Sequence, residues 1–230
     1  MRYDLHIHSC LSPCADREMT PATIAGLCAL NGADVIAIAD HNSARNLPAA
    51  EKCCKAYGVK LLPALEANTA EEIHLLCYFP TVEAALTLGD ALYESLPEFD
   101  WDPAIWGPQW VMNEDDEIID QPKKLLTTAA GLTLEETSRL CRELGGVPVP
   151  AHIDRDSYSL LSVLGLWPEE PKFPLAELAD PGRAAALTAA GLVPPSLPFL
   201  TGSDAHCLEA LRTEFPLLAP DCPLRALLKK

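Results

Sequence analysis

All six histidines of this 230-residue chain lie in short segments at the ends of apolar, strand-like runs. In chain order these segments read DLHIHS, IAIADHN, EIH, VPVPAH and TGSDAH. Histidines with separate structural roles are not distributed in this way. The pattern indicates that several strands bring imidazoles and carboxylates to one place. That layout is typical of a polynuclear metal site, and it favours a metal-dependent hydrolase.

The composition of the chain argues against several other classes of protein. The formal net charge of −16 opposes binding to a nucleic-acid backbone, so no stable nucleic-acid complex is expected. The nine cysteines form no regular framework, which predicts reduced thiols and a cytoplasmic location. No apolar run approaches the roughly 20 residues needed to cross a bilayer, so no membrane partner is expected. The length suits a single domain over residues 1–230.

Strand-like runs alternate with helical patterns along most of the chain. The predicted strands are Arg2–His8, Asp34–Ala39, Val59–Glu66, Ile73–Phe79, Val147–His152 and Pro198–Gly202. The predicted helices are Ala22–Asn31, Ala49–Tyr57, Val82–Ser95, Leu134–Leu144 and Ala184–Ala190. Thr20-Pro21 is a helix start with an N-cap, and Gly58 is a helix end. The alternation predicts βα units around a parallel sheet, and side chains at the carboxyl ends of strands favour closure into a barrel.

Residues 97–124 interrupt this alternation. The segment holds three of the four tryptophans and four prolines, and it has little helical or strand periodicity. A hairpin from Gln109–Met112 to Glu117–Ile119 is expected, with Asn113–Asp116 as its turn. We interpret the segment as an insertion over one end of the barrel. It is either a lid that selects substrate or a surface excursion that covers apolar area.

Several residues have the spacing and chemistry of metal ligands. His6 and His8 are two apart on a predicted strand, so both side chains leave the same face. Asp204 and His206 repeat this spacing. Glu66 ends an apolar run, and a carboxylate there can bridge two cations through its two oxygens. Asp40 is a charged residue at the end of a buried strand, so its carboxylate must either be solvated or bind a ligand.

The motifs DLHIHS, IADHN, AHIDR and GSDAH, with the glutamate after the third strand, resemble those of the PHP (polymerase and histidinol phosphatase) metal-dependent phosphoesterases. The resemblance runs from Asp4 to His206, and the order of the motifs makes it specific. It implies a distorted (β/α)7 barrel with a site for up to three metals.

The resemblance also implies how the ligands are shared. The first metal would take His6, His8, Glu66 and Asp204, the second Glu66, His74 and His152, and the third His41 and His206 with one acid. Asp40 would be either a ligand or an outer-shell partner that orients a histidine.

The acid of the third site is where the sequence departs from the family pattern. The first motif of the family usually continues HxHSxxSDG, which puts an acid where this chain has Pro13. Counting back from the Thr20-Pro21 helix start gives Asp16 instead. We therefore expect Asp16 to complete the third and weakest site, on a lengthened loop.

The ligand set suits two or three divalent transition metals, Zn²⁺, Mn²⁺ or Fe²⁺. Two cations about 4 Å apart can hold a bridging hydroxide that attacks phosphorus, and Glu66 would position that pair. Arg155 and Arg45 are the expected phosphate-binding side chains. Cys10, Cys14, Cys77 and Cys207 are thiolate candidates, but the histidines and acids already fill the expected positions.

The sequence therefore predicts hydrolysis of a small phosphate monoester or nucleotide, a nucleoside bisphosphate being one example. The alternatives are an exonuclease on short oligonucleotides, a metal-dependent amide or lactone hydrolase, and a non-enzymatic metal-binding regulatory module.

Overall fold

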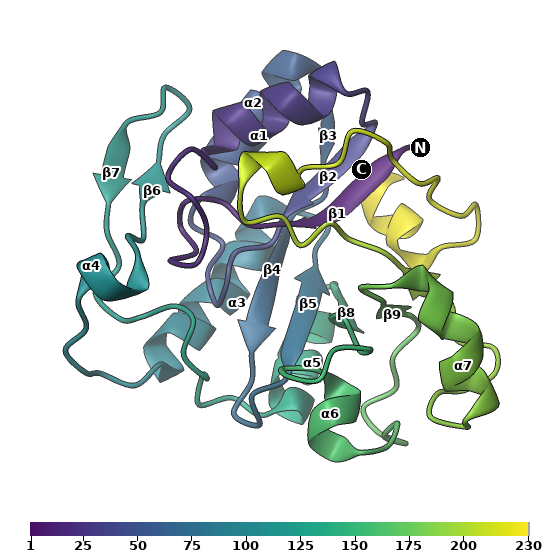
Figure 1. Cartoon of the computed structure of the whole chain (residues 1–230). Coiled ribbons are helices and arrows are strands. Elements are labelled where there is room, and N and C mark those ends of the chain that lie inside the picture. Colours follow the sequence, from purple (N-terminus) through teal and green to yellow (C-terminus); the bar gives the residue numbers. More distant parts are fainter. Residues whose placement is uncertain (230) are drawn as a thin grey trace.

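The computed structural model describes residues 1–229 and has a mixed α/β fold, as the sequence predicts (Figure 1). Its strands are β1 (Tyr3–Ile7), β2 (Val35–Ile38), β3 (Lys60–Leu61), β4 (Ala64–Asn68), β5 (His74–Tyr78), β6 (Val111–Met112), β7 (Ile118–Asp120), β8 (Val147–Pro150), β9 (Ala176–Glu177) and β10 (Phe199–Leu200). Its α-helices are α1 (Pro21–Leu30), α2 (Leu47–Tyr57), α3 (Val82–Ser95), α4 (Pro103–Trp106), α5 (Leu134–Glu143), α6 (Leu160–Leu164) and α7 (Ala184–Ala189). The 3-10 helices are Pro181–Arg183, Leu208–Ala210 and Pro223–Lys229.

The five predicted helices all form, and their ends follow from local chemistry. The hydroxyl of Thr20 accepts a hydrogen bond from the amide of Thr23, which makes it the N-cap of α1. Gly58 ends α2 with a φ of 76°, a left-handed conformation that glycine adopts without strain. The elements α4, α6 and β9 were not predicted, because each is too short to show a periodic pattern.

The prediction of a uniformly parallel sheet is wrong. Strands β1, β2 and β3 are parallel, but β5 runs antiparallel to both β4 and β8. The cause is the short connection at residues 69–73 between β4 and β5, which has no room for the crossover that parallel neighbours need. In this hairpin Asn68 pairs with His74, so the start of β5 lies beside the end of β4.

The predicted strand Val59–Glu66 is divided into β3 and β4, with Pro63 between them. Within residues 1–229 the strands form four separate sheets rather than one continuous barrel sheet. Single backbone bridges connect neighbouring sheets. His41, just after β2, bridges to Glu66 of β4, and Ile7 of β1 bridges to Ala205 on the loop after β10. The amide of Ile153 also donates to the carbonyl of Glu177 at 2.9 Å. The β9 and β10 strands have only two residues each, which leaves little length for continuous pairing.

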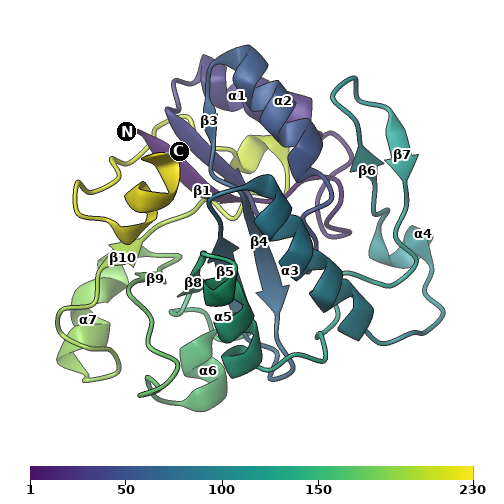
Figure 2. The same ribbon diagram turned by 180° about the vertical axis from the view of Figure 1, so that it is seen from behind.

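Two apolar clusters form the core, and the smaller one borders the polar residues of the candidate site. Helices α3 and α5 cover the back of β4, β5 and β8 in the larger cluster (Figure 2). The smaller cluster takes alternate residues from several strands, Ala39, Ala64 and Leu76 among them. Because side chains alternate along a strand, the same faces include His41 and Glu66, two residues after Ala39 and Ala64, and His74, two residues before Leu76. The polar residues therefore lie at the end of a buried apolar layer.

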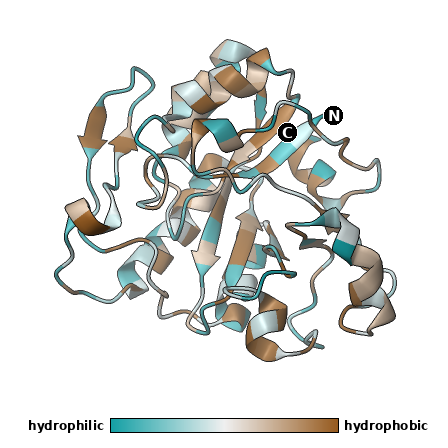
Figure 3. Ribbon diagram, viewed as in Figure 1, coloured by the Kyte–Doolittle hydropathy of each residue, from teal (hydrophilic) through white to brown (hydrophobic). Residues whose placement is uncertain are grey.

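The 97–124 insertion contains α4 and the β6–β7 hairpin, close to the predicted one (Figure 1). The insertion contains apolar residues, coloured brown on the ribbon in Figure 3, and several of their side chains are exposed, Ile105 at 78% and Ile119 at 63%. On its inner side the amide of Trp110 donates to the carbonyl of Cys10. Asn46 contributes two hydrogen bonds to the same strand edge, at the Trp110 carbonyl and the Met112 amide. The insertion thus packs against the loop that follows His8.

Candidate metal centre

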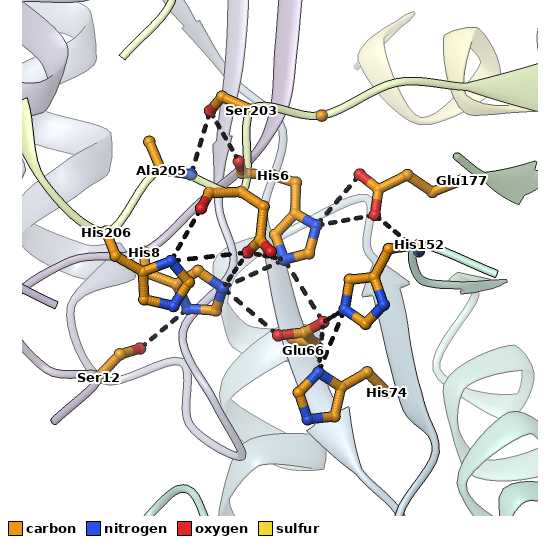
Figure 4. Close-up of polar contacts among 12 residues, drawn as sticks. His6, His8, Ser12, Glu66, His74, His152, Glu177, Ser203, Ala205 and His206 are labelled. Carbon is orange, nitrogen blue, oxygen red and sulfur yellow. Dashed lines mark hydrogen bonds and ion pairs between the residues drawn. The ribbon is translucent and has the colours of Figure 1, made fainter. Parts of the chain in front are cut away.

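The side chain of Glu66 is the centre of the polar cluster (Figure 4). It is fully buried, and neither carboxylate oxygen accepts a hydrogen bond. Five imidazole nitrogens nevertheless lie within 3.1–3.4 Å of it, from His6, His8, His41, His74 and His152. The five histidines come from four segments of the chain that are far apart in sequence. The structure therefore brings together the histidines that the sequence places at separate strand ends.

His6 and His8 point the same nitrogen into the cluster. The Nδ1 atom of His6 lies 2.9 Å from the carboxylate of Glu177, which accepts its proton. The Nδ1 atom of His8 lies 3.1 Å from the hydroxyl of Ser12. Each histidine therefore presents Nε2 inward, and the two Nε2 atoms are 3.1 Å apart.

Asp40 acts on His8 through Ser12. Its carboxylate accepts hydrogen bonds from the Ser12 hydroxyl at 2.7 Å, the Ser9 amide at 2.7 Å and the Ser9 hydroxyl at 2.6 Å. Because the one proton of the Ser12 hydroxyl goes to Asp40, the hydroxyl accepts from His8 Nδ1. Of the two roles considered for Asp40, the geometry favours the outer partner that orients a histidine.

Asp204 and His206 lie on the loop after β10. The Oδ1 atom of Asp204 is 3.1 Å from His8 Nε2 and 3.3 Å from His6 Nε2. His206 donates from Nδ1 to the carbonyl of Asp204 at 2.8 Å, and its ring stacks on that of His8 with centroids 4.2 Å apart. The loop is held by the amide of Asp204, which donates to the carbonyl of His6.

Three residues of the cluster region have left-handed backbones. The φ angles of Asn42, His152 and Asp204 are 49°, 27° and 51°. A non-glycine residue in this region costs of order 1–3 kcal/mol, and such strain is concentrated at functional sites. Neighbouring contacts hold these residues in place, and the side chain of Asn42 donates to the carbonyls of Leu126 and Thr128.

The donor set fits divalent cations. With Nδ1 of His6 and His8 engaged by outer partners, the inward nitrogens, Glu66 and Asp204 all present lone pairs to one another. Such an arrangement is repulsive unless positive charge lies between the atoms. The buried nitrogens His41 Nδ1 and His152 Nδ1 also lack hydrogen-bond partners. Imidazole and carboxylate ligands together suit Zn²⁺, Mn²⁺ or Fe²⁺.

The pKa values of the clustered histidines and of Glu66 are shifted by burial and by their close contacts. Burial opposes the charged form of His8, but the contacts with the carboxylates of Asp204 and Glu66 outweigh it and raise the pKa of His8 to about 9. The pKa of His41 is also raised to about 9. Burial lowers the pKa of His74 and of His206 to about 4. Burial would raise the pKa of Glu66, but His74 and His6 hold it well below its usual value.

The structure does not bring Asp16 into the cluster, contrary to the prediction. Its side chain is exposed and lies with Cys207 and Glu209, while His8, His41 and His206 group without it. The backbone explains the displacement, because the Asp16 amide donates to the carbonyl of His206 and turns the residue outward. Burial and the nearby His8 oppose the charged form of His41, but Cys14 and Glu66 outweigh them and raise the pKa of that histidine.

The two predicted phosphate-binding arginines lie in different places. Arg155 is at the cluster, with Nη1 2.6 Å from the Oδ2 atom of Asp204. Arg45 is directed to the insertion, where it pairs with Asp120 at 3.3 Å and lies 4.6 Å from the centre of the Tyr93 ring. The prediction of a substrate role for Arg45 is therefore not supported.

A cavity of about 130 Å³ opens onto the cluster. It is lined by His41, Glu66, His74, His152, Arg155, Ser157, Tyr158, Asp204 and His206. The ring of Tyr158 stacks on that of His74 with centroids 4.8 Å apart. None of the described residues of the 97–124 insertion belongs to this lining, so the insertion borders the loop after His8 and not the cavity. Cys10 and Cys77 are buried thiols, and burial raises the pKa of Cys10 to about 12.

Sequence reasoning missed Glu177. It is 3% exposed, it faces His6, and it accepts a hydrogen bond from the amide of His152. Its signal is the single acid in the apolar run Leu175–Leu178, the same kind of pattern that identified Glu66. The buried acid Asp4 was also missed. It accepts from the amide of Ser203 and lies 3.6 Å from Arg212, and so supports the loop before Asp204.

Comparisons with known proteins support the fold. No protein-family model matches the chain, and none of the curated proteins matches it. A solved amidohydrolase of Chromobacterium violaceum with bound sulfate and no metal is 18% identical, with a TM-score of 0.68, over 99% of this chain and 97% of that one. A Bifidobacterium adolescentis protein assigned as a metal-dependent phosphoesterase is 18% identical, with a TM-score of 0.56, over 98% of this chain and 95% of that one.

The lesion-specific endonuclease PfuEndoQ of Pyrococcus furiosus is 23% identical, with a TM-score of 0.59. The match covers 90% of this chain and 48% of the endonuclease, so the chain spans about half the length of that protein. Endonuclease Q has also been solved with a 27-mer duplex that carries an abasic lesion. At these identities the similarities establish a shared α/β fold with neighbours of the phosphoesterase and amidohydrolase types. In the part of the chain that the structure describes, no helix is long and apolar enough to cross a membrane.

Proposed function

We propose that this chain is a metal-dependent hydrolase that cleaves phosphate esters. The observation that carries the proposal is the environment of Glu66. A carboxylate without hydrogen bonds, fully buried among five imidazole nitrogens at 3.1–3.4 Å, has the donor set of a cation site. The solved structures with a similar fold include hydrolases and a metal-dependent phosphoesterase, which supports the same class of chemistry.

Membership of the PHP family and an irregular barrel belong to the same proposal. The bridges from His41 to Glu66 and from Ile7 to Ala205 support it, because they connect sheets at points where barrel neighbours would meet. The hydrogen bond from Ile153 to Glu177 joins β8 to β9 in the same manner. The strands around the smaller apolar cluster would then present their polar ends on one face of the barrel.

Three groups of residues would hold the cations. His6, His8, Glu66 and Asp204 form the first group, and Glu66, His74 and His152 form the second. His41 and His206 belong to the third, with His8 nearby and without Asp16. Glu66 belongs to both of the first two groups: Oε2 lies 3.4 Å from Nε2 of His8 and Oε1 lies 3.1 Å from Nδ1 of His74, so it is the proposed bridging ligand.

A small phosphate monoester, a nucleoside bisphosphate included, is the proposed substrate. The cavity of about 130 Å³ has room for a phosphoryl group, and Arg155 lies at its wall. The guanidinium has five donors in a fixed fork, so it can hold a phosphate oxygen while it contacts Asp204. The −16 net charge opposes a long polyanion more than a small one.

Bound divalent cations would supply Lewis-acid polarisation of a phosphoryl oxygen and a nucleophilic water at neutral pH. The protein's own residues prepare the site for this. Glu177 and Ser12 each accept an Nδ1 proton, which leaves Nε2 of His6 and His8 free as ligands. Arg155 would hold the phosphoryl group, and the walls of the cavity would exclude bulk water.

Cleavage of a phosphodiester in nucleic acid is the second candidate. It is supported by the similarity to PfuEndoQ, which covers 90% of this chain. Amide hydrolysis is a third option, supported by the similarity to the amidohydrolase.

A substrate panel distinguishes these possibilities. The protein would be loaded in turn with Zn²⁺, Mn²⁺ and Fe²⁺ and assayed on phosphate monoesters, a nucleoside bisphosphate, short oligonucleotides and amides. The proposal expects the highest kcat/KM on a monoester, no turnover after chelation, and a strongly lowered kcat with Glu66→Gln. Turnover of amides alone, or turnover that survives complete metal removal, would contradict it.

A further inference from the structure

The carboxylate of Glu177 holds His6 from the side opposite the cluster. Its two oxygens lie 3.1 and 2.9 Å from His6 Nδ1, and the contact is buried on both sides. Oε2 also accepts the amide of His152 at 3.1 Å. One side chain therefore contacts residues of both proposed ligand groups, although it points at neither group's inward nitrogens (Figure 4).

We propose that Glu177 is a positioning residue that fixes the orientation and tautomer of His6 and thereby sets the affinity of the first cation. The inference rests on the proposed function, because it assigns an outer partner to that same site. The carboxylate accepts the Nδ1 proton, so the lone pair of His6 stays on Nε2, which faces Glu66 at 3.4 Å and Asp204 at 3.3 Å. A carboxylate behind a histidine also increases the basicity of its ligating nitrogen.

The backbone around Glu177 is built for this close approach. A Cβ atom at Gly202 would lie 2.3 Å from Oε1 of Glu177 and 2.3 Å from Cβ of His6, so only glycine fits there. Gly202 has an ordinary backbone conformation, so space and not φ is what requires a glycine. The absence of a side chain at this position allows the carboxylate and the imidazole to meet.

The position of Glu177 is fixed by its strand. The amides of Ile153 and Leu178 pair with the carbonyls of Glu177 and Leu200, which holds β9 between β8 and β10. The side chain is therefore delivered by backbone contacts that do not depend on the carboxylate. A change of the carboxylate alone should leave the strand in place, and this makes the role testable.

The test compares Glu177→Gln with Asp154→Asn. Asp154 is a matched control, because it is a buried acid that accepts the amides of Ala179 and Asp180, next to β9, and has no hydrogen bond to a histidine. The probe is Zn²⁺, titrated against a competing chelator in the folded protein. We expect Glu177→Gln to weaken one equivalent by about 10–100-fold and to spare the others. Asp154→Asn should bind every equivalent like the wild type while its Tm falls.

Wild-type affinity for every equivalent in Glu177→Gln would overturn the inference, as would an equal loss in Asp154→Asn, which would mean a general effect on structure. If Glu177→Gln fails to fold, the same titration on Glu177→Asp decides, because its shorter side chain keeps the charge but withdraws from His6. Wild-type protein that binds no Zn²⁺ would contradict the proposed function itself, and this result is distinguishable from a failure of Glu177 alone.

Discussion

The guanidinium of Arg155 lies 2.6 Å from the carboxylate of Asp204, which in turn lies 3.1 Å from Nε2 of His8. The arginine that would meet substrate is thus attached to a proposed metal ligand. Its side chain is 45% exposed while that of Asp204 is 11% exposed, so the free edge of the guanidinium faces the opening. Substrate binding and the geometry of the first cation are therefore linked through one contact.

Arg155→Ala is expected to raise KM for a phosphate monoester by on the order of 10–100-fold, the loss that one charged hydrogen bond implies. Arg45→Ala is the matched control, because its guanidinium pairs with Asp120 away from the cavity. The control should keep the wild-type kcat/KM and lose at most about 1 kcal/mol of stability, as exposed pairs do. Steady-state kinetics of both variants check this. A larger effect for Arg45 than for Arg155 would reverse the assignment.

Glu66→Gln is expected to lower kcat by more than about 100-fold. Loss of a residue that only orients a metal ligand costs up to about 100-fold, and loss of a direct ligand should cost more. The reason is that Glu66 is proposed as a ligand of two cations and contacts five histidines, whereas His41 is proposed as a ligand of the third cation alone. His41→Gln should therefore cost less activity at saturating metal. The measurement is kcat together with metal content by elemental analysis. Near wild-type kcat in Glu66→Gln would show that it does not bridge.

The metal-free protein is expected to be most stable near pH 6.5. His8 and His41 have pKa values raised to about 9, so their contribution is complete below pH 6.5 and is lost as the pH rises to 9. His74 and His206 have pKa values lowered to about 4, so their contribution is lost as the pH falls from 6.5 to 4. Thermal unfolding of chelator-treated protein from pH 4 to 9 gives the test. Saturating Zn²⁺ should remove the alkaline decline, because metal replaces the protons.

Asn46→Ala is expected to lower the free energy of unfolding by about 1–3 kcal/mol, because it leaves the buried Met112 amide without its acceptor. The same side chain also donates to Ser9 and to the Trp110 carbonyl. If the insertion only supports the loop after His8, KM should not change. Denaturant unfolding and KM on a monoester, measured together, separate this role from that of a lid, which predicts a raised KM.

The α/β fold and its helices are predictable from the sequence because their signals are local. The Thr20 cap, the glycine after α2 and the apolar run of β2 each act within a few residues. The histidine segments are visible for the same reason, since every one lies at one end of an apolar strand-like run. The meeting of these segments at Glu66 could be inferred, because strand ends on one face of a sheet are close together.

Most of the errors concern contacts that no local pattern encodes. The antiparallel direction of β5 is the exception, because it follows from the short 69–73 loop. Glu177 lies on a strand of two residues, too short for a period-two signal. Asp16 and Arg45 have suitable chemistry near the motifs, but a backbone hydrogen bond to His206 and a pairing with Asp120 turn them away. The directions of these two side chains depend on contacts with residues that are far away in the sequence.

The cluster joins segments that are far apart in the sequence, since His6 on β1 faces Asp204 on the loop after β10. During synthesis, His6 and His8 leave the ribosome long before Asp204 is made. Until then Arg155 has no Asp204 to contact and the cation would lack one of its carboxylates. A nascent chain can therefore form α1 and α2 early, but the complete set of proposed ligands exists only after Asp204 and His206 have been made.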